Sequence, residues 1–110
     1  MVQENAIPKL HIYAARIDGT TQYQWEVTIM APDATGRRVL GYRASGTIQD
    51  DLIKVVFEKG PEVHDENLPR WTPMNPTDRP DIRKEIAQKA ASAVKRLKAS
   101  GQDSFQHTIP

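Results

Sequence analysis

The sequence predicts an α+β domain: a three-stranded antiparallel meander, then a short helix, then a long C-terminal helix packed on one face of the sheet. Two observations carry this prediction. Three segments in the first half of the chain alternate apolar and polar residues, and residues 79–100 repeat apolar residues at helical spacing. A four-stranded antiparallel sheet with one C-terminal helix is the alternative.

Composition limits both the fold and the function. The 110 residues, 38% hydrophobic and 26% charged, suit a single domain spanning residues 1–110. Cysteine is absent, which excludes disulfides, thiolate zinc sites and cysteine nucleophiles. No stretch approaches the roughly 20 apolar residues that cross a bilayer, and the acidic, polar amino terminus is not a secretory signal. We therefore expect a cytoplasmic protein with no membrane partner.

The first two strands form a hairpin in this interpretation. Residues 1–8 are a loose arm that ends at Pro8, and residues 18–21 (Asp-Gly-Thr-Thr) form the turn between strands at residues 10–17 and 23–30. If Ile17 pairs with Gln22, the apolar residues of the two strands share one face. This register places Leu10 opposite Ile29, Ile12 opposite Val27 and Ala14 opposite Trp25.

The third strand is predicted at residues 37–45, ending before Gly46, with Met30 opposite Arg37. Val27 then faces Leu40, Trp25 faces Tyr42 and Tyr23 faces Ala44. The buried row of the central strand is Tyr23, Trp25, Val27 and Ile29. The opposite face of the sheet carries His11, Tyr13, Gln24, Glu26, Thr28, Val39, Gly41 and Arg43.

Residues 47–59 fit either a helix or a strand. The β-branched run after Leu52 favours a strand. Thr47 as a cap, Asp50 in the first turn and Gly60 at the end favour a helix. We predict the helix because the capping and charge signals agree.

Four prolines fall within residues 61–78, so we expect an irregular, extended connector there, held to the core by Leu68, Trp71 and Met74. The long helix follows at residues 79–100, capped by Asp78 and ended by Gly101. Residues 102–110 are expected to be a frayed tail. The apolar stripe of this helix is interpreted as a core contact, with a homodimer through the C-terminal helix as the alternative. Its residues are Ile82, Ile86, Ala90, Ala93 and Leu97.

The usual catalytic and cofactor motifs are absent. The chain has no phosphate-binding loop, dinucleotide fingerprint, zinc-protease motif or nucleophile elbow, so the sequence predicts no cofactor, no metal and no catalytic residue. The densest polar cluster is His64, Asp65 and Glu66. It suggests a metal-dependent enzyme as the least favoured function, because a solvated acidic loop is the preferred interpretation of the cluster.

The favoured function is a small non-catalytic accessory or inhibitor-type protein that binds a protein partner. The surfaces considered are a sheet edge, the alanine-rich helix and the proline-rich segment. The alternative is nucleic-acid binding, although the net charge of +1 is small. In that interpretation Tyr13 stacks on a base, and the cations that contact phosphates are Arg37, Arg38, Arg43, Lys95, Arg96 and Lys98.

Overall fold

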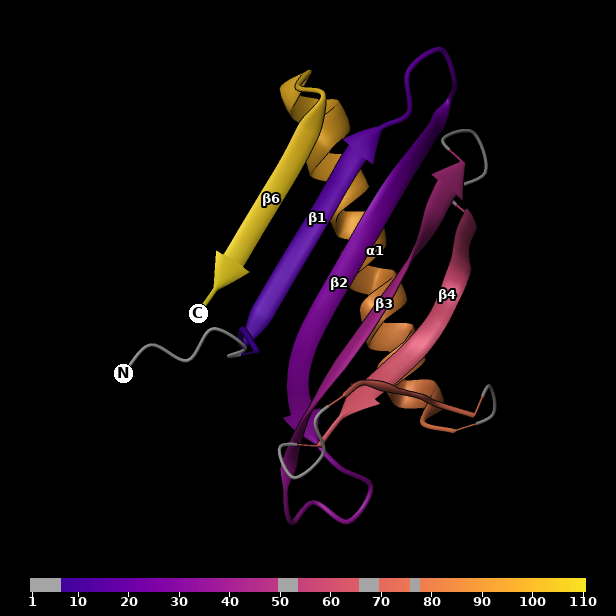
Figure 1. Ribbon diagram of the computed structural model, residues 1–110. Coiled ribbons are helices and arrows are strands. Elements are labelled where there is room, and N and C mark those ends of the chain that lie inside the picture. The colour runs from indigo at the N-terminus through magenta and orange to yellow at the C-terminus, as the bar shows by residue number, and fades with distance from the viewer. Residues whose placement is uncertain (1–6, 50–53, 66–69, 76–77) are drawn as a thin grey trace.

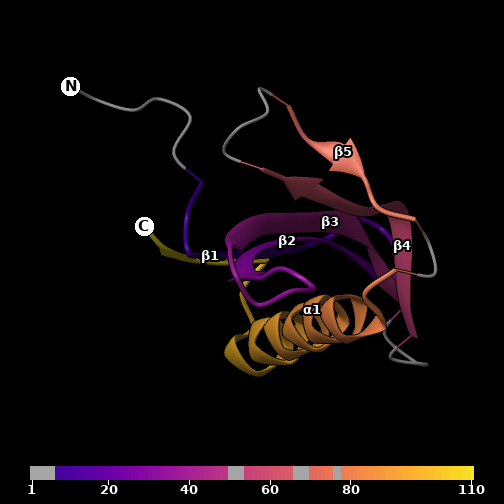
Figure 2. The ribbon, with the colours of Figure 1, turned by 90° about the horizontal axis from the view of Figure 1, so that it is seen from below.

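A computed structural model gives the structure of the protein and describes residues 7–49, 54–65, 70–75 and 78–110. One six-stranded antiparallel sheet forms the first layer, and one helix lies across a single face of it as the second (Figures 1 and 2). The predicted α+β class is confirmed. Along the chain the elements are β1 (Leu10–Arg16), β2 (Gln22–Pro32), β3 (Val39–Gln49), β4 (Lys54–His64), β5 (Thr72–Pro73), α1 (Pro80–Ser100) and β6 (Ser104–Ile109).

The spatial order of the strands is β5-β4-β3-β2-β1-β6, so β2 and β3 are central. The predicted pairing of β1 with β2 is confirmed, since Leu10 pairs with Ile29 and Ala14 with Trp25.

Most of the predicted arm at residues 1–8 lies outside the described residues. No helix in the described part of the chain is long and apolar enough to cross a membrane.

The predicted pairing of β2 with β3 is wrong by four residues. Trp25 pairs with Gly46 instead of Tyr42, and β3 continues past Gly46 to Gln49. The turn is displaced two residues along the chain, to residues 33–38, because Asp33 organises it: its carboxylate accepts hydrogen bonds from the backbone N–H groups of Thr35 (3.0 Å) and Arg37 (3.2 Å). A shift by an even number preserves the alternation, so the predicted faces of the sheet still hold.

The predicted helix at residues 47–59 is wrong. Its described residues belong to β3 and β4, while residues 50–53 lie outside the described part. Gly60 and Pro61 form a bulge in β4, where Ser45 pairs with Lys59 but Arg43 pairs with Glu62. The bulge lets β4 continue through a proline, because the residue there does not need to donate a ladder hydrogen bond.

The proline-rich segment is more regular than expected. β4 runs to His64, and Thr72–Pro73 forms β5 against it, with the Met74 N–H donating to the Pro61 carbonyl oxygen (2.9 Å). Met74 packs against the core as predicted, whereas Leu68 lies outside the described residues. The sheet curls at this edge, so that the C-terminal end of β4 and β5 lie on the side away from α1 (Figure 2).

The long helix is confirmed at Pro80–Ser100, ending at Gly101, but Asp78 does not cap it. Arg79 is the capping residue, in a left-handed conformation (φ 49°) and without a side-chain cap. The apolar stripe of α1, from Ile82 to Leu97, is buried against the sheet of the same chain. A homodimer through α1 would therefore have to use its polar side.

The core lies between α1 and the sheet and is centred on Trp25, which is 1% exposed. The predicted row is buried as expected: Tyr23, Trp25, Val27 and Ile29. The indole N–H of Trp25 donates to the Thr47 carbonyl oxygen (3.2 Å), and its ring meets Phe57 edge-on at 5.2 Å between centroids. Trp25 thus connects β2 to β3 and β4.

Candidate functional site

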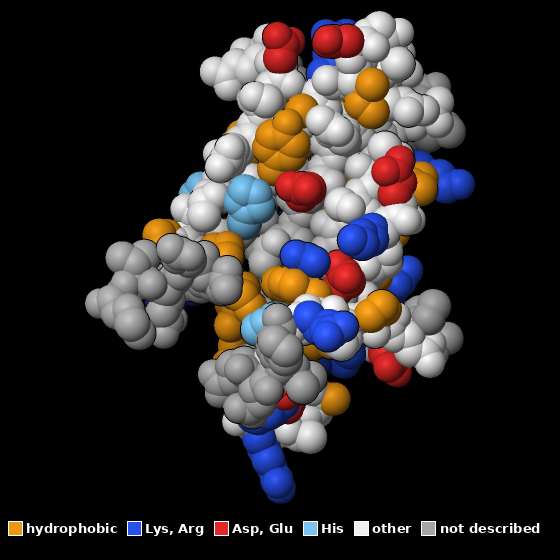
Figure 3. Space-filling model, in the orientation of Figure 1, with side chains coloured by type: hydrophobic (Ala, Val, Ile, Leu, Met, Phe, Trp, Pro, Cys, Tyr) orange, Lys and Arg blue, Asp and Glu red, His pale blue; other side chains and the backbone are white. Residues whose placement is uncertain are grey.

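The sheet face opposite α1, here named the open face, carries charges of both signs side by side (Figure 3). Tyr13 pairs with Glu26, and Arg43 pairs with Thr28, which places these side chains on this face as predicted. A shallow hollow beside them is lined by Glu26 and Glu62 as well as by Arg43 and Lys59. The open face is therefore not a continuous basic surface.

Arg43 already interacts with two side chains of the same chain. Its Nε donates to the Glu62 carboxylate (3.0 Å), and its guanidinium lies 4.3 Å from the centre of the Trp71 ring. The His64 ring lies 5.3 Å from Trp71 on the same side. Gly41 makes room for Trp71, since a β-carbon there would lie 3.2 Å from the indole. Trp71 therefore holds the β5 segment to the open face. The prediction that Trp71 packs against the core is wrong.

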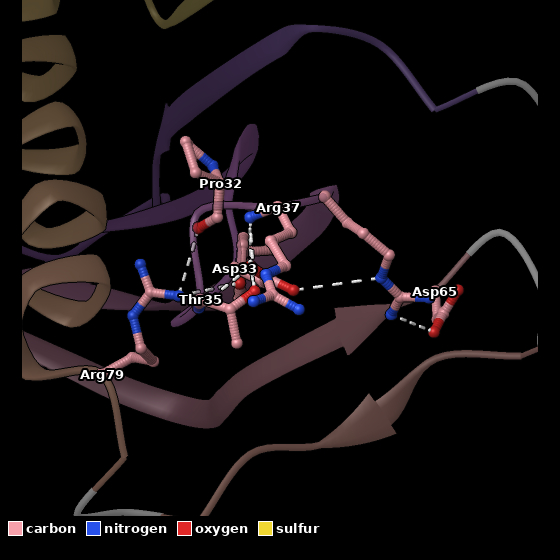
Figure 4. Close-up of polar contacts among 8 residues, drawn as sticks. Pro32, Asp33, Thr35, Arg37, Asp65 and Arg79 are labelled. Carbon is pink, nitrogen blue, oxygen red and sulfur yellow. Dashed lines mark hydrogen bonds and ion pairs between the residues drawn. The ribbon is translucent and has the colours of Figure 1, made fainter.

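Arg37 and Arg38 lie in the turn between β2 and β3, shown in Figure 4. Arg38 forms an ion pair with Asp65, and Asp33 lies 3.9 Å from it on the other side. The hydrogen bond from the Thr35 hydroxyl, with further ones from backbone N–H groups, lowers the pKa of Asp33. This cluster stabilises the turn, and its acids offset its cations.

Lys95, Arg96 and Lys98 belong to the last turns of α1, which covers the other face of the sheet. The seven residues predicted for nucleic-acid binding thus lie in three places: the open face, the turn after β2 and the end of α1 (Figures 1 and 2). The structure does not bring them together.

The predicted metal or acid–base cluster is also divided. The His64 ring contacts Trp71 at an angle of 53° between the ring planes, Asp65 pairs with Arg38, and Glu66 lies outside the described residues. Within the described ranges no three His, Asp or Glu side chains gather in a way that could hold a metal ion.

A feature that the sequence interpretation missed is β6. Instead of a frayed tail, Ser104–Ile109 pairs with β1 in an unbroken antiparallel register and forms one edge of the sheet. A weak signal was present, because the two apolar residues of the segment, Phe105 and Ile109, are an even number of positions apart and would share one face of a strand. His11 Nδ1 and Thr108 Oγ1 are hydrogen-bonded across the pair at 2.8 Å.

The hydrogen bonds of β1 show which backbone groups of β6 face outward. The Arg16 N–H donates to the Asp103 carbonyl oxygen (2.9 Å), so these two residues form a hydrogen-bonded pair. Hydrogen-bonded and non-hydrogen-bonded pairs alternate along an antiparallel ladder, so every second residue of β6, counted from Asp103, is also bonded to β1. In β6 these are Phe105, His107 and Ile109. The N–H and C=O groups of Ser104, Gln106 and Thr108 therefore point away from β1, where no other described strand pairs with them.

The two edges of the sheet differ. At one edge β5 has only two residues, one of them Pro73, and the neighbouring β4 is bulged at Pro61. Short strands, prolines and bulges protect an edge from pairing with another chain. β6 has six residues and none of these devices, and it carries no Lys, Arg, Asp or Glu. It is therefore the unprotected edge.

Comparison of the chain with protein families, with curated proteins and with solved structures finds no match.

Proposed function

We propose that this protein is a non-catalytic binding module that recognises a protein partner by adding an extended segment of that partner to β6. The observation that carries the proposal is the unprotected edge: Ser104, Gln106 and Thr108 direct backbone groups outward from a strand without a bulge and without Lys, Arg, Asp or Glu. Strand addition to such an edge is a recurrent mode of peptide recognition.

The outward backbone groups of β6 could form up to six hydrogen bonds with an added strand. Three outward residues supply three N–H donors and three C=O acceptors, each worth about 0.5–1.5 kcal/mol once paired. Side chains on the two faces of the added strand would then contact Phe105 and His107 on the helix side, and Gln106 on the open face. Main-chain pairing gives affinity in this mode, and the flanking side chains give specificity.

The nucleic-acid alternative has weaker support. Its cations lie in three places, and Arg38 and Arg43 are paired with acids. It predicts an affinity that falls steeply with salt and falls again when Lys95, Arg96 and Lys98 lose their charge. The enzyme interpretation rests only on His64, Asp65 and Glu66. A cytoplasmic location remains a prediction.

Amide hydrogen exchange measured by NMR tests the proposal. Peptides selected from a random displayed library should protect the amides of Ser104, Gln106 and Thr108, which in the free protein exchange faster than those of Phe105, His107 and Ile109. A library that yields no binder, or binders that leave these three amides unprotected, would contradict the proposal.

A matched pair of variants at one position provides the control. Gln106→Pro removes an outward N–H that makes no bond to β1, so the fold should survive while peptide binding is lost. Gln106→Ala keeps the N–H and should bind as the parent protein does. Equal binding by the two variants would place the peptide elsewhere.

A further inference from the structure

A groove with basic side chains runs along the helix side of the unprotected edge. It lies between α1 and the underside of β1 and β6 and has a volume of about 260 Å³. Its lining residues are Ile12, Lys89, Ser92, Ala93, Arg96, Phe105 and His107. The four from α1 follow the i, i+3, i+4, i+7 spacing of a single helix side, and Ile12, Ala93 and Phe105 give it an apolar floor.

From this groove we infer that the segment added to β6 is acidic, with carboxylates on the residues that face α1. The inference rests on the proposed function and specifies the chemistry of the partner. An added strand lies about 4.8 Å beyond β6 and directs every second side chain toward the helix. Those side chains would meet Lys89 and Arg96 from α1 and His107 from β6.

The charges around the groove are predominantly positive. From Lys89 to the end of α1 there are four basic residues and no acid, and β6 contributes no acid. Glu85 lies 3.7 Å from Lys89 one turn earlier, and Arg96 lies 5.9 Å from the centre of the Phe105 ring. An exposed i,i+4 pair such as Glu85 with Lys89 contributes little, so Lys89 remains available to an incoming carboxylate.

The spacing sets the pattern of the partner. Lys89 and Arg96 are two helical turns apart, about 10.5 Å along the axis. Alternate residues of a strand are about 7 Å apart. Carboxylates at positions i and i+2 or i+4 of the added strand therefore lie within reach of both cations.

The same charges disfavour a second copy of this chain as the occupant. Antiparallel pairing of β6 with β6 of another copy would place the two basic helix sides next to each other. Like charges brought together at an interface oppose association. An acidic segment is complementary to this edge, whereas a second copy is not.

Three synthetic peptides test the inference. In each, threonine alternates with one other residue, which is glutamate, glutamine or lysine. The glutamate peptide should bind roughly tenfold more tightly than the glutamine peptide, and the lysine peptide should bind least. The Lys89→Gln/Arg96→Gln variant should lose the preference for glutamate and keep its affinity for the glutamine peptide. Lys84→Gln, an exposed helix position outside the groove, should leave the preference unchanged.

The outcomes separate the two proposals. If the glutamine and glutamate peptides bind equally and both protect the amides of Ser104, Gln106 and Thr108, the acidic preference is wrong and strand addition stands. If the glutamate peptide binds without protecting them, the groove attracts it without an added strand, and the inference fails. If no peptide binds, the proposed function fails as well. If the protein dimerises in sedimentation with these amides protected, a second copy is the occupant and the inference is overturned.

Discussion

Gly46 lies directly against the backbone of Val56. A β-carbon on Gly46 would lie 1.8 Å from the Val56 carbonyl oxygen. Because the clash is with backbone, no movement of side chains can relieve it. The close approach occurs beside the bulge in β4, where Gly46 is also paired with Trp25. Glycine is therefore required by the packing of two strands, not by a turn.

Gly46→Ala should lower the free energy of unfolding by about 2–4 kcal/mol, because β4 must move away from β3 to make room. Gly60→Ala is the matched control, since a β-carbon there meets nothing within 4 Å. Urea denaturation of both variants measures the difference. Similar midpoints for the two would contradict the close approach.

Arg79 fastens the start of α1 to the sheet. Its Nη1 donates to the Pro32 carbonyl oxygen (3.2 Å; Figure 4) and to the Tyr42 hydroxyl (3.1 Å). Its Nε and Nη2 donate to the Asp81 carboxylate. Arg79→Ala should destabilise the protein by about 1–2 kcal/mol. Arg79→Gly loses the same contacts but relieves the left-handed backbone, so it should be the more stable of the two. Thermal unfolding measures both, and the reverse order would contradict this account.

Acid should weaken the fold partly through Asp33 and Asp81. The hydrogen bond from Thr35 lowers the pKa of Asp33, and the one from Arg79 lowers the pKa of Asp81. An aspartate whose pKa is depressed in the folded state stabilises that state above its unfolded pKa, about 3.9, and this stabilisation is lost as pH falls through the lower folded value. In urea denaturation across acidic pH, Asp33→Asn should show a smaller decline than the parent protein. An unchanged decline would show that Asp33 makes no such contribution.

The alternation of backbone groups along β6 has a direct test in stability. His107→Pro removes an N–H that bonds to β1 and leaves the Ile12 carbonyl without its partner, so it should cost about 1–3 kcal/mol. Gln106→Pro removes an outward N–H and should cost less than about 1 kcal/mol. Thermal unfolding measures the loss of stability in each variant. A greater loss for Gln106→Pro would mean that the bonded and outward residues are interchanged.

The sequence pattern predicted the structural features that depend on residues close together in the chain. The short turn at Asp18 and Gly19 left little freedom in how β1 pairs with β2, so their register was correct. Alternation alone cannot distinguish registers that differ by an even number of residues, and the turn built on Asp33 shifted β3 by four. In β4, the consecutive apolar residues Val55, Val56 and Phe57 interrupted the alternation, since Val56 is exposed, and residues suited to a helix cap outweighed the strand signal.

The candidate site was less predictable because it combines distant segments. β6 pairs with β1, and His11 and Thr108 are 97 residues apart in sequence. Lys89 was not among the residues that the sequence singled out, and Arg96 was assigned to phosphate contact, whereas the structure places both beside β6. Charge and spacing along the chain could not show that this side of α1 adjoins an unprotected strand.

The pairing of β1 with β6 also bears on how the chain folds. It closes a loop of nearly the whole sequence, and such long-range contacts form late and slowly because of the chain entropy lost on closure. Until β6 is in place, β1 is itself an exposed sheet edge. We therefore expect β6 to dock last, covering one open edge and creating the next, so the proposed binding edge would form only as folding is completed.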